Sequence, residues 1–208
     1  MNKTPVTGII LTRNNEDTIQ RALTSIIPLI QELVIVDDHS TDHTLDIIKS
    51  TYPEAKIYTR ALDDHFANQR NFALSKANNQ WVLMIDSDEE VSQLLKIEIE
   101  TVLENPKYKA YISRRDNAAF DKWSKNHSGR PILLESQLTF ENRIHETVKQ
   151  TKLGYLKNIL YHHSWTSVKA YVLDIIQYAK WQANDWYHKN PHYSLPYLVL
   201  RCFVSLPC

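Results

Sequence analysis

The sequence predicts an α/β fold in which helices cover both faces of a mostly parallel sheet. Over the first half of the chain, short apolar runs alternate with amphipathic stretches, and this alternation is typical of parallel strands joined by helices. The chain has 208 residues, of which 43% are hydrophobic and 23% are charged. This length and composition favour one globular domain with a sizeable core.

The first half of the chain contains alternating candidate strands and helices. Strands are expected at residues 6–12, 33–36, 56–59 and 81–85, and all but the third are mostly apolar runs. Helices are expected at residues 17–27, 41–51, 66–77 and 91–103. In the first of these helices, Ile19, Ala22, Leu23 and Ile26 fall on one face. The last is ended by Asn105-Pro106, because proline cannot continue a helix.

The pattern changes after about residue 107. Residues 108–113 alternate like a strand, whereas residues 114–130 are polar and aromatic without a clear period and are expected to form a loop. A strand or hairpin is predicted at residues 131–140, and another strand at residues 158–162. The apolar residues at 167–188 recur at helical spacing, which predicts a long helix.

Composition excludes several classes of protein. Lys plus Arg and Asp plus Glu both number 24, so there is no basic excess of the kind that indicates a nucleic-acid partner. The three glycines cannot form a Walker loop or a G-x-G-x-x-G motif. The two cysteines, Cys202 and Cys208, form no disulfide framework, and a reducing cytoplasm is the expected location. The N-terminal run is neither a signal peptide nor a membrane span.

The most informative motif is Asp86-Ser87-Asp88, directly after the predicted strand at residues 81–85. Two carboxylates at a strand end can hold Mg²⁺ or Mn²⁺, and these ions keep positions open for phosphate oxygens. The alternative is a polar turn that only closes the strand. Polar residues also follow two other predicted strands, at residues 12–14 and at Asp37-Asp38. Because ligands bind at the carboxyl ends of parallel strands, we expect these three groups to share one cleft.

Five motifs in this order resemble the inverting nucleotide-sugar glycosyltransferases of family 2. They are GIILTRNNEDTIQRAL, ELVIVDDHSTDHTLDI, FANQRNFAL, WVLMIDSDEEVS and RIHETV, and the resemblance covers residues 6–165. The most similar subgroup is the small bacterial β-glucosyltransferase-like one that acts on lipopolysaccharide core. The resemblance implies a Rossmann-like GT-A fold with a nucleotide-sugar half at about residues 1–106 and an acceptor half at about residues 107–165.

The resemblance also implies roles for individual residues. Thr12, Arg13 and Asn14 would meet the nucleotide, and Asp37 would bind its base. Gln69, Arg70 and Asn71 would lie near the ribose and diphosphate, together with Asp86. Asp88 would bind Mg²⁺ or Mn²⁺, Glu146 would be the catalytic base, and either His162 or His163 would be a late metal ligand, with His163 the one we assign.

The expected reaction is the metal-dependent transfer of a sugar, most simply from a UDP-sugar, to a hydroxyl of a glycan or glycolipid. Cell-surface polysaccharide or lipopolysaccharide synthesis is the expected setting. The alternatives are a catalytically silent nucleotide-sugar or partner-binding module and a phosphohydrolase of the haloacid-dehalogenase type. A phosphohydrolase of this type needs an early nucleophilic Asp and a Gly-Asp pair, and this sequence contains neither.

Residues 166–208 are expected to form a C-terminal helix and an apolar tail. The tail, LPYLVLRCFVSLPC, is too short to span a bilayer. It could lie against the inner face of the membrane, pack on the domain, or be the cut edge of a longer product. The sequence leaves these three possibilities open.

Overall fold

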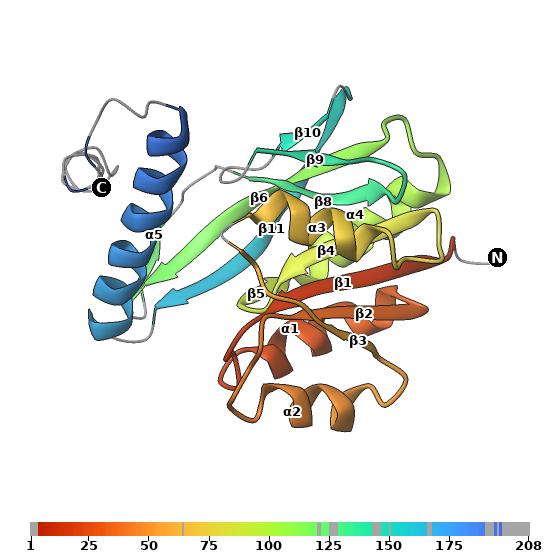
Figure 1. The fold of residues 1–208 in the computed structure, drawn as a ribbon. Coiled ribbons are helices and arrows are strands. Elements are labelled where there is room, and N and C mark those ends of the chain that lie inside the picture. Colours follow the sequence, from red (N-terminus) through yellow and green to blue (C-terminus); the bar gives the residue numbers. More distant parts are fainter. Residues whose placement is uncertain are drawn as a thin grey trace.

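A nine-stranded sheet runs through the whole protein and carries helices on both of its faces (Figure 1). The structure is a computed structural model that describes residues 4–63, 65–119, 122–124, 129–142, 147–149, 151–165 and 168–189, together with Ser194 and Pro196. The strand order is β3-β2-β1-β4-β8-β6-β11-β5, with β7 paired to β6. The predicted α/β, Rossmann-like arrangement is confirmed.

The strands of this sheet are β1 (Val6–Thr12), β2 (Glu32–Asp37), β3 (Lys56–Thr59), β4 (Trp81–Asp86), β5 (Glu89–Val91), β6 (Ala110–Ala119), β7 (Lys122–Ser124), β8 (Pro131–Glu135) and β11 (Leu153–Trp165). A separate two-stranded sheet consists of β9 (Phe140–Glu141) and β10 (Thr147–Val148). The helices are α1 (Ile19–Ile26), the short 3₁₀ helix η1 (Ile27–Leu29), α2 (Thr44–Thr51), α3 (Phe66–Leu74), α4 (Gln93–Glu104) and α5 (Val168–Lys189).

Strands β3, β2, β1 and β4 are parallel neighbours, and their side chains alternate between two cores. Ile10 and Ile35 point to one face, where they pack with α1, α2 and α4. Ile9 and Val34 point to the other, where they pack with α3 and the β9–β10 hairpin. Because both faces of β1, β2 and β4 are covered, these three strands are nearly continuous apolar runs, which is why the sequence located them well. The edge strand β3 is only partly buried.

The second half of the sheet corrects one expectation. Residues 114–130 were expected to form a loop, but β6 continues to Ala119 and β7 pairs back onto it. The strand continues because β11 lies parallel beside β6 and satisfies its backbone groups up to this point. In this extension of β6, Arg115 and Asn117 face charged partners rather than a core. The sequence there has no apolar alternation from which the strand could be predicted.

Helix α5 follows β11 and stands at one end of the sheet (Figure 1). Trp181 packs edge-on against Phe66 at the start of α3, with ring centroids 5.2 Å apart, and Ala179 and Ala183 are fully buried. Among the helices in the described ranges, none is long and apolar enough to cross a membrane. Apart from Pro196, the apolar tail lies outside the described residues.

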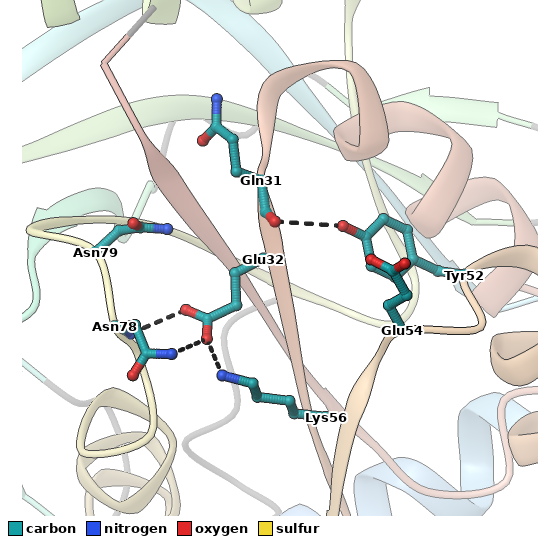
Figure 2. A pocket seen from close by; sticks show the side chains of 7 residues that line it. All are labelled: Gln31, Glu32, Tyr52, Glu54, Lys56, Asn78 and Asn79. Carbon is teal, nitrogen blue, oxygen red and sulfur yellow. Dashed lines mark hydrogen bonds and ion pairs between the residues drawn. The ribbon is translucent and has the colours of Figure 1, made fainter.

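A polar pocket lies at the amino ends of the parallel strands, where the carboxylate of Glu32 is the central acceptor (Figure 2). It accepts hydrogen bonds from Lys56 Nζ, from the hydroxyl of fully buried Thr7, and from the backbone and side-chain amides of Asn78 at 2.8 and 2.7 Å. These bonds tie the starts of β1, β2 and β3 to the turn before β4. The pocket is at the opposite end of the sheet from Asp86-Ser87-Asp88, so we interpret it as structural.

Replacing Glu32 with Gln is expected to lower the free energy of unfolding by about 1–2 kcal/mol at pH 7, since it removes charge-assisted bonds to partly buried donors. Burial would raise the pKa of Glu32, but Lys56, Thr7 and Asn78 outweigh it and hold the pKa below the ordinary value of a glutamate. The ionised form therefore stabilises the fold above about pH 4.5, and this advantage disappears as the pH falls through the lowered pKa.

Urea unfolding at several pH values tests this prediction, and Glu54→Gln in the same pocket is the matched control. Glu54 is exposed, so its replacement should leave stability unchanged. A Glu32→Gln deficit that is the same at pH 3 and at pH 7 would contradict the assigned role of the charge.

Candidate functional site

The carboxyl ends of β1, β2 and β4 meet at one edge of the sheet. Thr12 is in register with Asp37 on one side, and Leu11 is in register with Asp86 on the other. The side-chain oxygen of Asn15 accepts hydrogen bonds from Ser87 Oγ at 2.6 Å, from Thr12 Oγ1 at 3.1 Å and from the Arg13 amide at 3.0 Å. Asn15 thus joins the ends of β1 and β4, and the expected convergence of the three strand ends is present.

The predicted nucleotide-side residues are arranged around the turn after β1. Asp37 is 1% exposed and accepts a hydrogen bond from the Ser40 amide at 3.1 Å. Arg13 is exposed and pairs with Asp38 at 3.0 Å. Asn14 has a φ of 50°, and its side-chain oxygen accepts a hydrogen bond from the Thr41 amide at 2.7 Å. These bonds hold the turn after β1 against the turn after β2.

Asp86 sits between two guanidinium groups. Its Oδ1 lies 3.1 Å from Arg70 Nη2 and 3.1 Å from Arg130 Nη2. Burial would raise the pKa of Asp86, but Arg130, Arg70 and Arg115 outweigh it and keep the pKa below its ordinary value. Asp86 is therefore ionised and orients two cations at the sheet edge, where a diphosphate could also meet them.

Glu89 is a buried acid that we did not single out from the sequence. Its side chain is fully buried, and its Oε2 lies 2.6 Å from Arg130 Nη2 and accepts the Asp86 amide at 2.9 Å. Its Oε1 lies 3.4 Å from Arg115 Nη1. Glu89 therefore balances two arginines and closes the turn that carries Asp86 and Asp88.

Asp88 faces His162 across the β5–β11 pair. His162 Nε2 lies 3.2 Å from Asp88 Oδ2, and His162 Nδ1 lies 2.9 Å from Asn117 Oδ1. Burial lowers the pKa of His162, but the bond to Asp88 outweighs it and the net shift is upward. His163 points elsewhere, with its Nε2 3.0 Å from Glu90 Oε2. Of the two adjacent histidines, the geometry thus favours His162 over the assigned His163 as the partner of Asp88.

The donor atoms at Asp88 and His162 fit a divalent cation. Neighbouring ligands of an octahedral ion at about 2.1 Å lie about 3 Å apart, close to the 3.2 Å between these two atoms. In the described ranges no cluster of three or more His, Cys, Asp or Glu residues could hold a metal. As far as the described residues go, a cation here would take its remaining ligands from water or from a phosphate-bearing substrate.

Two residues expected near the ribose and diphosphate make hydrogen bonds to other residues of the protein instead. Gln69 is 2% exposed; its amide nitrogen donates to the Arg60 carbonyl at 2.8 Å, and its oxygen accepts from the Arg60 guanidinium. Asn71 donates to the Phe140 carbonyl at 2.9 Å and accepts from the Phe140 amide at 2.7 Å. Of the three neighbouring residues, Arg70 alone is placed at Asp86.

Glu146, the expected catalytic base, lies outside the described residues, as does His145. The strands on either side of this segment are described, and β9 and β10 pair through Glu141–Thr147 and Phe140–Val148. Because Asn71 holds Phe140, this hairpin is attached to α3 directly beside Arg70, whose guanidinium carbon lies 5.9 Å from the centre of the Phe140 ring. Strand β9 is thus held next to Arg70.

Three residues of the site lie in the stretch that we expected to be a loop. They are Arg115 and Arg130, which contact Glu89, and Asn117, which contacts His162. The sequence feature that could have indicated a close chain approach here is Gly129. In the structure, a Cβ at this position would lie 1.8 Å from the Ser113 carbonyl oxygen. Only glycine allows this approach of the chain to β6. The close approach delivers Arg130 to the site, where its Nη1 also donates to the Met84 carbonyl at 3.2 Å.

Comparison with known proteins gives a consistent result. The family model "Glycosyl transferase family 2" matches residues 7–173. An uncharacterized glycosyltransferase of Rickettsia typhi is 29% identical over 208 residues, which cover 91% of this chain and 70% of the relative. A second, from Rickettsia prowazekii, is 29% identical over 222 residues, which cover 96% of this chain and 75% of the relative.

Among solved structures, a fragment of S. aureus TarS in complex with UDP-GlcNAc has a TM-score of 0.60 at 17% identity. The match covers 96% of this chain and 71% of that one. At this identity the likeness shows that the two proteins share a fold.

Proposed function

Because the chain belongs to glycosyltransferase family 2, we propose that this glycosyltransferase moves a sugar, with inversion, from a UDP-sugar to a hydroxyl of a glycan or glycolipid, and that it requires Mg²⁺ or Mn²⁺. The observation that carries the proposal is the single sheet edge that joins Thr12, Asp37, Asp86 and Asp88 with the arginines around them. This is where a nucleotide binds on a parallel sheet.

The donor side of the proposal rests on charge. Arg70, Arg115 and Arg130 bring three cations to the two carboxylates of Asp86 and Glu89, and the nearby Asp88 carboxylate balances the third. A divalent cation held by Asp88 would make this edge net positive. A diphosphate with its own cation complements such an edge. In the absence of a glycine-rich loop, arginines and a metal are the groups that can bind it. UDP is the proposed nucleotide, as in the TarS complex of the same fold.

Asp88 and His162 are the residues that would hold the cation. A carboxylate with an imidazole suits Mn²⁺ better than Mg²⁺, because the affinity of nitrogen ligands is greater for the transition metal. When bound, the cation supplies electrostatic stabilisation to the departing diphosphate. Arg70 and Arg130 add to this stabilisation from the protein.

Inversion needs one displacement at the anomeric carbon. The acceptor oxygen forms the new bond as the bond to the diphosphate breaks, and a base takes the acceptor proton. We assign the base to Glu146, which is covalently attached to β10 through Thr147. Phe140 of the neighbouring strand β9 lies beside Arg70, which supports a base close to the leaving group.

The acceptor is proposed to be a cell-envelope glycan or glycolipid, reached from the cytoplasmic side. The apolar C-terminal tail could then contact the membrane surface, as the sequence allows. A silent binding module remains the alternative function. It differs from the proposed enzyme in one measurable way, because it would bind a UDP-sugar without releasing UDP.

Asp88→Ala tests the proposal. In wild-type protein, we expect UDP and at least one UDP-sugar to raise the melting temperature more with Mn²⁺ or Mg²⁺ than with EDTA. Loss of the Asp88 carboxylate should remove this metal-dependent part and weaken UDP binding with Mn²⁺ by at least about tenfold. Isothermal titration with UDP, with and without Mn²⁺, measures it.

Glu90→Gln is the matched control, because Glu90 lies two residues further on and pairs with His163. Its UDP affinity should equal that of the wild type. If Asp88→Ala binds UDP and Mn²⁺ as tightly as the control does, the proposed metal role of Asp88 is wrong. Binding of UDP-sugars without any UDP release would favour the silent module.

A further inference from the structure

Both ring nitrogens of His162 lie close to a side-chain oxygen of another residue. Nε2 faces Asp88 Oδ2 at 3.2 Å, and Nδ1 faces Asn117 Oδ1 at 2.9 Å. Asn117 and His162 are in register on the parallel strands β6 and β11, and Glu89 of β5 is in register with His162 on its other side. The ring is therefore placed by the backbone pairing of three strands.

The contact at Nδ1 decides which nitrogen can bind a cation. The side-chain oxygen of Asn is an acceptor only, so Nδ1 must carry the proton in this bond. Without a cation, Nε2 also faces an acceptor and donates its proton to the Asp88 carboxylate. A cation would displace that proton and take the Nε2 lone pair, while Nδ1 keeps its proton for Asn117. A metal-bound histidine needs this kind of support from its other nitrogen.

We propose that Asn117 is a positioning residue that directs the Nε2 lone pair of His162 toward a divalent cation shared with Asp88. The inference rests on the proposed metal role of Asp88 and His162. Asn117 reaches the ring only because β6 extends past Ser113 along β11. The extension of β6 thus has a function, which is to bring an acceptor behind the histidine.

The two acids that follow Asp88 contact other residues than the Nδ1 atom of His162. Glu89 contacts Arg115 and Arg130, and Glu90 contacts His163. The Nδ1 contact at hydrogen-bond distance is therefore assigned to Asn117.

The test is Mn²⁺ affinity in the full chain with UDP present and no turnover, measured from free Mn²⁺ by electron paramagnetic resonance. His162→Ala and Asn117→Leu are each expected to weaken Mn²⁺ binding, the second by about 10–100-fold. Asn117→Asp keeps an oxygen acceptor of the same reach and should remain within a few-fold of wild type. Circular dichroism establishes that each variant is folded.

A second measurement separates positioning from a general structural effect. Long-range ¹H–¹⁵N spectra at pH 9, recorded with UDP and the diamagnetic ion Mg²⁺, report which nitrogen of His162 carries the proton. We expect the Nδ1–H form in wild type and Asn117→Asp, and a shift toward Nε2–H in Asn117→Leu.

The outcomes are distinguishable. If His162→Ala loses Mn²⁺ affinity but Asn117→Leu keeps both the affinity and the Nδ1–H form, Asn117 has no positioning role and the proposed function stands. Equal losses in Asn117→Leu and Asn117→Asp would also overturn the inference. If His162→Ala binds Mn²⁺ normally, both the inference and the metal role of His162 are wrong.

Discussion

Glu146→Gln is expected to slow sugar transfer by about 10²–10⁴-fold, the usual contribution of a general base, while UDP affinity stays unchanged. Glutamine has nearly the shape of glutamate but cannot take the acceptor proton. The described part of the molecule explains why the effect should fall on the chemical step. Asn71 and the Phe140 ring attach β9 to α3 beside Arg70, one of the arginines proposed to stabilise the departing diphosphate.

The measurement is UDP release from the UDP-sugar that stabilises the protein best, with water as the acceptor where no other is supplied. UDP binding is measured in parallel by titration. Glu141→Gln is the matched control in the same hairpin, because Glu141 is about half exposed and pairs only with Lys149 at 3.0 Å among the contacts described. Equal slowing in both variants would mean that the hairpin, and not the carboxylate of Glu146, is responsible.

The parallel half of the fold could be predicted from sequence because its buried strands are short apolar runs separated by amphipathic helices. Strands β1 and β3 have the bounds that the sequence predicts, and both cores depend on the alternation of buried residues along β1, β2 and β4. The polar extension of β6 could not be found this way. Its residues, such as Arg115 and Asn117, face charged partners, and an alternation of polar with polar residues carries no period.

The limits of motif reading are clearest at residues 69–71. Successive helix residues point about 100° apart, so three neighbours cannot all face one ligand. Arg70 faces Asp86, whereas Gln69 turns to Arg60 and Asn71 to Phe140. A motif assigns a segment to a site, but the direction of each side chain depends on packing that the sequence does not state. The same reason separates His162 from His163, which lie on opposite faces of β11.

Glu89→Leu is expected to lower the free energy of unfolding by about 3–5 kcal/mol, the typical cost of removing one partner from a buried ion pair. Leucine has a similar volume, so packing changes little. The loss comes from Arg115 and Arg130, which would keep their charge without the carboxylate that balances it. The Asp86 amide would also lose its acceptor, which now lies at 2.9 Å.

Urea unfolding followed by circular dichroism measures this effect. Glu90→Gln is the control at the next residue, and its effect should stay below about 1 kcal/mol because Glu90 is about one-third exposed. Should Glu89→Leu fail to fold, Glu89→Gln keeps one oxygen acceptor and should give a smaller but measurable loss.

The comparison of the two variants decides what the second acid of the Asp-Glu-Glu run contributes. Glu89 and Val91 face the interior on the same side of β5, while Glu90 faces the other side. If Glu89→Leu were as stable as Glu90→Gln, the arginines would not depend on this carboxylate for their balance. Asp86 alone would then have to hold Arg130, and the turn that carries Asp88 would be stable without the bond from Glu89 to the Asp86 amide.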